Sequence, residues 1–138
     1  MEELITSLMV EPGKRPAIVQ LCNHSDFLRR AVSRDADWVC DLGMTMLEDG
    51  VVVLFNDEAV LLGLDGNRRV GQNILAGTFY VVGVKKQHLI SLTAAQIVRY
   101  TARFWDAESY TYAEVLDAWT NATYEQITQD CSAVFTEK

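Results

Sequence analysis

Two adjacent arginines, Arg68 and Arg69, follow Asn67 in a glycine-containing stretch between two apolar runs, DGNRRVGQNILAGTFY. A guanidinium group binds phosphate or carboxylate through two parallel hydrogen bonds, and backbone amides beside glycine can approach an anion closely. The pattern predicts an exposed loop that binds an anionic small molecule. The sequence leaves open a structural alternative, in which the arginines cap backbone carbonyls or pair with Asp65.

Four further residues can join this loop if the fold brings them to it. Lys14 and Arg15 form a basic pair after a Pro-Gly turn, and Lys85 stands near the expected end of a strand. Thr78 offers a hydroxyl within the same glycine-containing stretch. Short basic pairs are also typical of a solvated surface, which is the alternative here. The candidate ligand-binding residues are therefore Asn67, Arg68, Arg69, Thr78, Lys14, Arg15 and Lys85.

The sequence contains no pattern that indicates a catalytic site or a metal site. His24 and His88 are isolated, without a cysteine or carboxylate at the spacing that a metal site needs. No G-x-S-x-G elbow or other nucleophile motif is present, and the acidic residues between the expected strands are typical of solvated turns. We therefore expect a non-enzymatic protein with no metal site and no cofactor.

Negative charge is concentrated at the C-terminal end of the 138-residue chain. The formal net charge is -7, and residues 106–137 contain seven acidic side chains but no lysine or arginine. Because nucleic-acid binding draws much of its affinity from lysine and arginine contacts to phosphate, broad nucleic-acid binding is not expected. A helix carrying Asp106, Glu108, Glu114, Asp117 and Glu125 can instead imitate a phosphate array toward a basic protein. A solvated outer face is the alternative.

The sequence also predicts where the protein acts. No apolar run approaches the roughly 20 residues that span a bilayer, and no signal peptide is visible at Glu2 and Glu3. The three cysteines are odd in number and widely spaced, which is typical of thiols in a reducing compartment. We expect a cytoplasmic protein that does not associate with membranes.

Hydrophobic periodicity predicts the elements that position these residues. A strand and its hairpin partner flank Pro12-Gly13, a short helix follows from about residue 26 to 35, and alternation of period two begins at Cys40. Thr93 and Thr111 each begin a capping box before residues with helical spacing. The expected strands are Leu4 to Glu11, Ala17 to Cys22, one beginning at Cys40, Val51 to Phe55, Ala59 to Leu64, and Ile74 to Val84.

These elements predict one α+β domain. We expect a largely antiparallel sheet of about six strands, with helices on one face and a C-terminal helical hairpin. Residues 1–105 form the core in this interpretation, and residues 106–138 form an acidic helical extension packed on the same core.

The chain resembles a known domain family in several short motifs. They are Val10-Glu11-Pro12-Gly13-Lys14, Asn67-Arg68-Arg69, Ile74 with Ala76-Gly77-Thr78-Phe79 and Val81-Val82-Gly83, and Ser91-Leu92-Thr93. In their order and spacing, from about Met9 to Trp105, they look like a family of phages and mobile genetic elements whose domain has no known function. The resemblance implies a small accessory protein that acts inside a bacterium, in host takeover or counter-defence. It implies no activity.

Two hypotheses of different classes follow. In the first, the protein sequesters an anionic, nucleotide-derived ligand at the loop of Asn67 to Arg69 without changing it. In the second, it inhibits a host defence nuclease or CRISPR effector through its acidic helix. The expected partner is accordingly an anionic small molecule or a host defence protein, and a homo-oligomer stays open.

Overall fold

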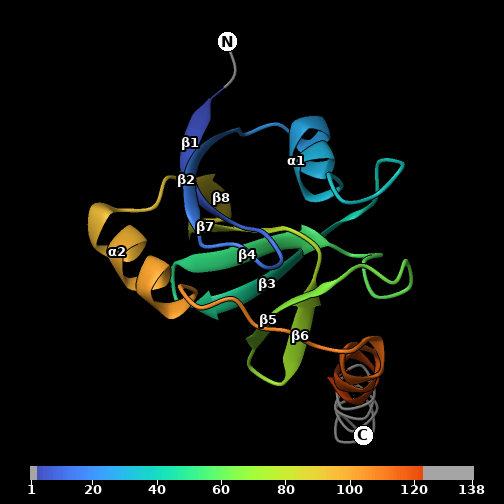
Figure 1. Cartoon of the computed structure of the whole chain (residues 1–138). Helices are drawn as coiled ribbons and strands as arrows, with labels where there is room; N and C mark the ends of the chain where they lie inside the picture. Colours follow the sequence, from blue (N-terminus) through green and yellow to red (C-terminus); the bar gives the residue numbers. More distant parts are fainter. Residues whose placement is uncertain (1–2, 123–138) are drawn as a thin grey trace, which may run out of the picture.

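The computed structural model describes residues 3–122 of the chain (Figure 1). Ten elements have defined bounds, and a further helix covers residues 112–122. In chain order the ten are β1 Leu4–Val10, β2 Ala17–Cys22, α1 Ser25–Val32, β3 Leu42–Glu48, β4 Val51–Asn56, β5 Gly66–Val70, β6 Asn73–Ala76, β7 Phe79–Lys85, β8 His88–Ile90 and α2 Ala94–Arg103.

Six strands form the main sheet, in the order β2-β1-β7-β4-β3, with β8 paired to β7. All of its printed pairings are antiparallel. The remaining two strands, β5 and β6, form a separate antiparallel ribbon. The predicted α+β class, the six-stranded antiparallel sheet and a C-terminal helix are confirmed.

The central strand β7 is apolar on both faces and therefore needs a cover on each. Tyr80 and Val82 join the hydrophobic cluster that Leu28 and Val32 of α1 complete. Phe79 and its same-face neighbours pack instead against α2 and the ribbon. The helices thus divide between the two faces, whereas we expected them on one face.

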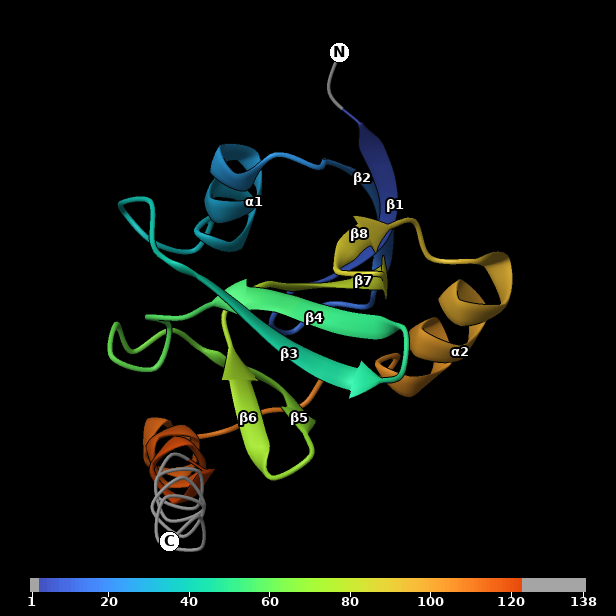
Figure 2. The same cartoon turned by 180° about the vertical axis from the view of Figure 1, so that it is seen from behind.

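The helix over residues 112–122 lies against the ribbon, away from α2 (Figures 1 and 2). Its Val115 and Ala118 pack with Ile74 and Ala76 of β6. Residues 104–111 connect it to α2 and pass along β5, as the orange trace shows in Figure 2. Residues 123–138, and with them Glu125 and the rest of the predicted extension, lie outside the described residues.

Local turn and cap signals predict the element boundaries well. The side chain of Thr93 accepts from the backbone N of Gln96 while Gln96 accepts from Thr93, so the capping box of α2 is confirmed. Thr111 and Glu114 make the same exchange at the start of helix 112–122. Hairpin loops occur at Pro12-Gly13 and at Asp49-Gly50, as predicted.

Three predictions in the middle of the chain are wrong. Residues 59–64 form turns rather than a strand, and residues 66–70 form β5 rather than a loop. The predicted strand Ile74 to Val84 is two strands that belong to different sheets. The break occurs at Gly77, whose φ of +73° directs the chain from the ribbon into the main sheet.

Candidate functional site

Arg68, the centre of the predicted anion-binding loop, lies inside the protein. It stands on β5 and its side chain is fully buried. Its Nε and Nη2 donate to the backbone oxygen of Phe104 at 3.2 and 2.8 Å, and Nη2 also donates to the oxygen of Lys14 at 2.6 Å. Phe104 is the C-cap of α2, so Arg68 satisfies a carbonyl at the negative end of that helix.

Asn67 completes this buried cluster. Its side-chain oxygen accepts from Nη1 of Arg68 at 2.7 Å, and its Nδ2 donates to the oxygens of Val10 and Gly77, both at 2.8 Å. The two side chains therefore tie together β1, the turn after β1, the ribbon and the end of α2. We call Asn67 and Arg68 the latch.

The electrostatics of the latch follow from its burial. Desolvation lowers the pKa of the Arg68 guanidinium, and the nearby carboxylates of Glu108 and Asp106 oppose that shift. The expectation of an exposed loop is wrong at these two residues, because their polar groups face backbone carbonyls instead of solvent. The structural alternative describes Arg68 better, since it caps carbonyls.

Arg69, Lys14 and Arg15 remain at the surface near the latch. The guanidinium carbon of Arg69 lies 5.8 Å from the ring centroid of Tyr110, and that of Arg15 lies 4.4 Å from the Trp105 ring. Nζ of Lys14 lies 3.5 Å from a carboxylate oxygen of Glu11. Arg69 and Arg15 thus lie over aromatic rings, and Lys14 lies beside a carboxylate.

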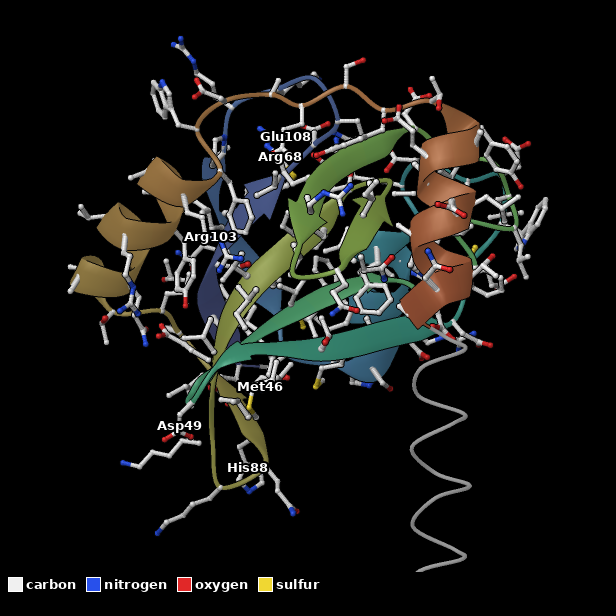
Figure 3. All side chains as sticks on the ribbon, turned by 90° about the horizontal axis from the view of Figure 1, so that it is seen from below. Met46, Asp49, Arg68, His88, Arg103 and Glu108 are labelled. Atoms are coloured by element: carbon white, nitrogen blue, oxygen red, sulfur yellow. The ribbon has the colours of Figure 1, made fainter. Side chains whose placement is uncertain are left out.

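Thr78 and Lys85 do not join them. Thr78 is fully buried, and its backbone N donates to Oδ2 of Asp35 at 2.6 Å. Lys85 pairs with His88 in the β7–β8 hairpin, and Figure 3 shows His88 at the opposite end of the molecule from Arg68. The seven predicted residues are therefore not brought together into one pocket.

A groove of about 680 Å³ lies elsewhere, between β3, the ribbon, the end of α2 and helix 112–122. This volume is in the range of small-molecule sites. Its apolar lining includes Leu47, Phe55, Val70, Ile74 and Trp119. Its polar lining consists of Thr45, Asn56, Asp57, Gln72, Asn73 and Arg103.

Asn56 is the buried polar side chain of this groove. It ends β4, is 2 % exposed, and accepts from the backbone N of Glu58 at 2.8 Å through its Oδ1. Its Nδ2 has no hydrogen-bond partner within the described residues. A flipped amide would set NH₂ against the N–H of Glu58, so the contact fixes Nδ2 as the unused donor.

Arg103 is the cation of the groove. It is exposed in the last turn of α2, and Figure 3 shows it on the α2 side of the ribbon. Its guanidinium carbon lies 5.1 Å from the Phe104 ring centroid, and within residues 3–122 it has no carboxylate within ion-pair distance. A cation beside a cavity and without a carboxylate partner can bind an incoming anion.

Two glycine positions shape the surroundings of the groove. The ring of Phe55 lies across Gly43 of β3, where a Cβ would stand 2.4 Å from the ring carbon Cε2. Gly71 has a φ of +60° at the first loop position of the β5–β6 hairpin, which a two-residue loop of this type requires. Glycine at position 43 thus leaves room for the Phe55 ring, and glycine at position 71 allows the tight β5–β6 loop.

The sequence analysis missed Asn56, Arg103 and Trp119 as site residues. Asn56 carried one local signal, because an asparagine directly after an apolar strand is typical of a side chain that caps the next turn. Arg103 and Trp119 carried none, since each occupies an ordinary position on an amphipathic helix. Only the packing of both helices around the ribbon brings them to one groove.

Two further findings concern the described residues. No three histidine, cysteine or carboxylate side chains in this part of the chain are placed to hold a metal ion. None of its helices combines the length and the apolar character required to cross a membrane.

Comparison with known proteins places the chain in one family. Residues 5–105 match the model of a family described as domain of unknown function (DUF3846). No curated protein and no solved structure matches the chain. The match covers the main sheet, the ribbon and α2, and it ends before helix 112–122.

Proposed function

This chain belongs to the DUF3846 family, and from its groove we propose that it captures a small anionic, nucleotide-derived ligand without converting it. The observation that carries this proposal is the pairing of Arg103, a cation without a carboxylate partner in the described residues, with a groove of ligand size. The proposed site replaces the loop at Asn67 to Arg69, whose latch residues are engaged with the backbone.

The lining supports a nucleotide over a simple anion. Trp119 offers an aromatic face on which a base can stack, and the amides of Gln72 and Asn73 offer hydrogen bonds to a base or sugar. The phosphate is assigned to Arg103 because a guanidinium matches its oxygens in a bidentate manner. Trp119 belongs to helix 112–122, which lies on the other side of the ribbon from Arg103 in Figure 3.

Capture without turnover is the form that the lining favours. Asp57 is the one acidic side chain among the described lining residues, and neither histidine nor cysteine accompanies it there. Paired acid and base groups, or a nucleophile beside a base, are what hydrolysis of such a ligand needs. With the resemblance to proteins of phages and mobile elements, these features favour a counter-defence role in the bacterial cytoplasm.

The alternative, inhibition of a host defence nuclease or CRISPR effector by the acidic helix, has less support. Glu114 caps helix 112–122, and Glu108 contacts the backbone of Arg69 and the hydroxyl of Tyr110. Asp106 and Asp117 stay exposed. Salt-sensitive binding to a basic protein that survives loss of the groove cation would favour this alternative.

The test is direct binding of a panel of cyclic, mono- and diphosphate nucleotides by equilibrium dialysis, with the bound ligand analysed after denaturation. We expect recovery of unchanged ligand and a loss of affinity of about ten-fold or more in Arg103→Gln, since a charge-assisted hydrogen bond contributes roughly 1.5–3 kcal/mol. Arg30→Gln is the matched control, because Arg30 is exposed on α1, which covers the other face of the sheet. Absence of binding across the panel, or an equal loss in both variants, would overturn the proposal.

A further inference from the structure

β3 is the last strand of the main sheet on one side (Figure 2), and no strand among the described residues pairs with its outer edge. Its middle residues Met44, Thr45 and Met46 are all exposed. Native edge strands are commonly protected by a lysine, a proline or a covering segment, and β3 contains neither lysine nor proline. β3 therefore offers an edge for pairing, which ends at the bulge between Met46 and Glu48.

The pairing of β3 with β4 determines which backbone groups face that edge. The backbone N of Asp57 donates to the oxygen of Asp41 at 3.0 Å, so these two residues form a hydrogen-bonded pair of the antiparallel ladder. Bonded and non-bonded pairs alternate along the register, so Gly43 and Thr45 bond to β4 as well. The residues between them direct their N–H and C=O groups to the free edge. They are Leu42, Met44 and Met46.

The same three residues place their side chains on one face of the sheet, because alternate residues of a strand share a face. Leu42 packs against the hydrophobic cluster that contains α1, while Met44 and Met46 are 51 % and 63 % exposed. Within residues 3–122, no hydrogen bond reaches the backbone of Met44 or Met46 from the free edge. A strand added here would gain backbone hydrogen bonds and would cover both methionines.

Exposed aspartates stand at both ends of this edge. Asp41 precedes β3, Asp57 pairs with it on the β4 side, and Asp49 lies in the turn after β3. In the described residues only Asp41 of these three has a cation within ion-pair distance, Arg29 at 4.0 Å. An added strand with basic residues at both ends complements these charges. A second copy paired antiparallel through β3 would instead bring aspartates to aspartates, which disfavours that occupant.

We propose that the free edge of β3 binds an extended segment of a partner protein as an added antiparallel strand. The segment carries apolar side chains opposite Leu42, Met44 and Met46 and basic residues at its two ends. The backbone hydrogen bonds supply the pairing, and the alternate side chains and terminal charges supply the selectivity. Met44 and Met46 also line the groove, but this contact uses the edge of β3 and not Arg103, so it is independent of the proposed function.

The probe is a fluorescent peptide of the sequence Lys-Val-Thr-Val-Thr-Val-Lys, blocked at both ends, whose valines lie opposite Leu42, Met44 and Met46 in the antiparallel register. Fluorescence anisotropy measures its binding to the intact chain. We expect a peptide with both lysines replaced by glutamate to bind at least about ten-fold more weakly. N-methylation of the central valine, whose N–H faces Met44, should abolish binding, whereas N-methylation of the adjacent threonine, whose N–H points away, should retain it.

Two proline variants test the same edge from the side of the protein. Met44→Pro removes the N–H that faces the free edge and no hydrogen bond to β4, so we expect binding at least about ten-fold weaker. Ile18→Pro is the matched control, because Ile18 is 60 % exposed on β2, the opposite edge of the sheet. Leu8, which pairs with Ile18, bonds to β7, so the N–H of Ile18 faces outward too. Thermal unfolding confirms that both variants are folded, and the N-methylated peptides test the pairing without any substitution.

Three results would overturn the proposal: no binding of the basic peptide to the native chain, equal binding of the two N-methylated peptides, or equal losses in the two proline variants. Sedimentation of the native chain tests the other occupant. A dimer that Met44→Pro abolishes would assign the edge to a second copy and overturn the proposal as well. None of these results affects nucleotide capture, which Arg103→Gln tests.

Discussion

The latch and the groove each contain one arginine and one asparagine, and they use them in opposite ways. In the latch, Arg68 and Asn67 donate five hydrogen bonds to four backbone carbonyls and bond to each other. In the groove, Arg103 has an aromatic neighbour and no carboxylate partner, and the Nδ2 of Asn56 is unpaired within the described residues. The same residue types therefore satisfy backbone carbonyls in one place and, within the described residues, keep a cation without an ion pair and a donor without a partner in the other.

Substituting each arginine tests the difference between the latch and the groove. Arg68→Met leaves the carbonyls of Phe104 and Lys14 and the Oδ1 of Asn67 without their donor inside the protein. We expect the free energy of unfolding to fall by roughly 3–5 kcal/mol, because each buried group that loses its partner costs about 1–3 kcal/mol. Urea unfolding measures this loss.

Arg103→Met is the matched substitution in the groove. It removes an exposed cation without an ion pair in residues 3–122, so we expect a change within about 0.5 kcal/mol. The expectation drawn from the sequence was the reverse, with Arg68 binding a ligand and contributing little stability. Equal destabilisation by the two substitutions would show that the latch has no special role.

The second comparison concerns the two asparagines. Asn67→Ser deprives the carbonyls of Val10 and Gly77 of their common donor, and we expect a loss of roughly 2–4 kcal/mol. Asn56→Ser keeps an acceptor for the N–H of Glu58 and removes a donor that has no partner among the described residues. We therefore expect the free energy of unfolding to fall by less than about 1 kcal/mol. Thermal unfolding at one pH compares them. A larger loss at Asn56 would mean that its Nδ2 is satisfied within the protein.

The strands and helices near both ends of the domain could be predicted from the sequence, whereas the ribbon and the burial of Arg68 could not. Cap and turn residues such as Thr93 and Gly50 act through neighbours within a few positions, so strands and helices at both ends of the domain were predicted closely. Arg68 has the opposite character, because its partners Lys14 and Phe104 lie 54 and 36 positions away. Without knowledge of those partners, two adjacent arginines are predicted to be exposed to solvent.

The groove was beyond prediction for a related reason. It needs β3, the ribbon, α2 and helix 112–122 at once, and no local pattern specifies how four elements meet. The alternation of β3 was recognised, yet Met44 and Met46 are 51 % and 63 % exposed, and on this face of β3 only Leu42 packs against the cluster that contains α1. Burial on a strand is set by its cover as much as by its pattern.

A third prediction concerns Gly66, the first residue of β5, against which Val115 of helix 112–122 packs. A Cβ on this residue would stand 2.8 Å from Cγ2 of Val115 and 3.0 Å from Cβ of Tyr110. We expect Gly66→Ala to destabilise the protein by roughly 1–3 kcal/mol through overpacking. The effect should shrink in a Val115→Ala background, where the clashing methyl group is gone, and a double-mutant cycle measures that coupling. Additive losses would contradict the close packing of helix 112–122 on β5.

The smallest expected effect uses Tyr100 as a reporter of the free charge on Arg103. Burial and the hydrogen bond to Glu48 raise the pKa of Tyr100 to about 12, while the positive charges of Arg99 and Arg103 act in the lowering direction. The folded state thus favours the protonated phenol. Its contribution to stability is present below pH 10, the ordinary pKa of tyrosine, and is lost as the pH rises toward 12.

The test of that reporter compares stability at several alkaline pH values in the native protein, Tyr100→Phe and Arg103→Gln. Tyr100→Phe should decline less between pH 10 and pH 12, because it lacks the group that deprotonates more readily when unfolded. Arg103→Gln should shift the tyrosine titration slightly further upward, since one opposing positive charge is removed. If Arg103→Gln leaves the titration of Tyr100 unchanged, the charge of Arg103 is already neutralised within the chain. Arg103 would then be paired as Arg68 is, and the difference between the two arginines would be contradicted.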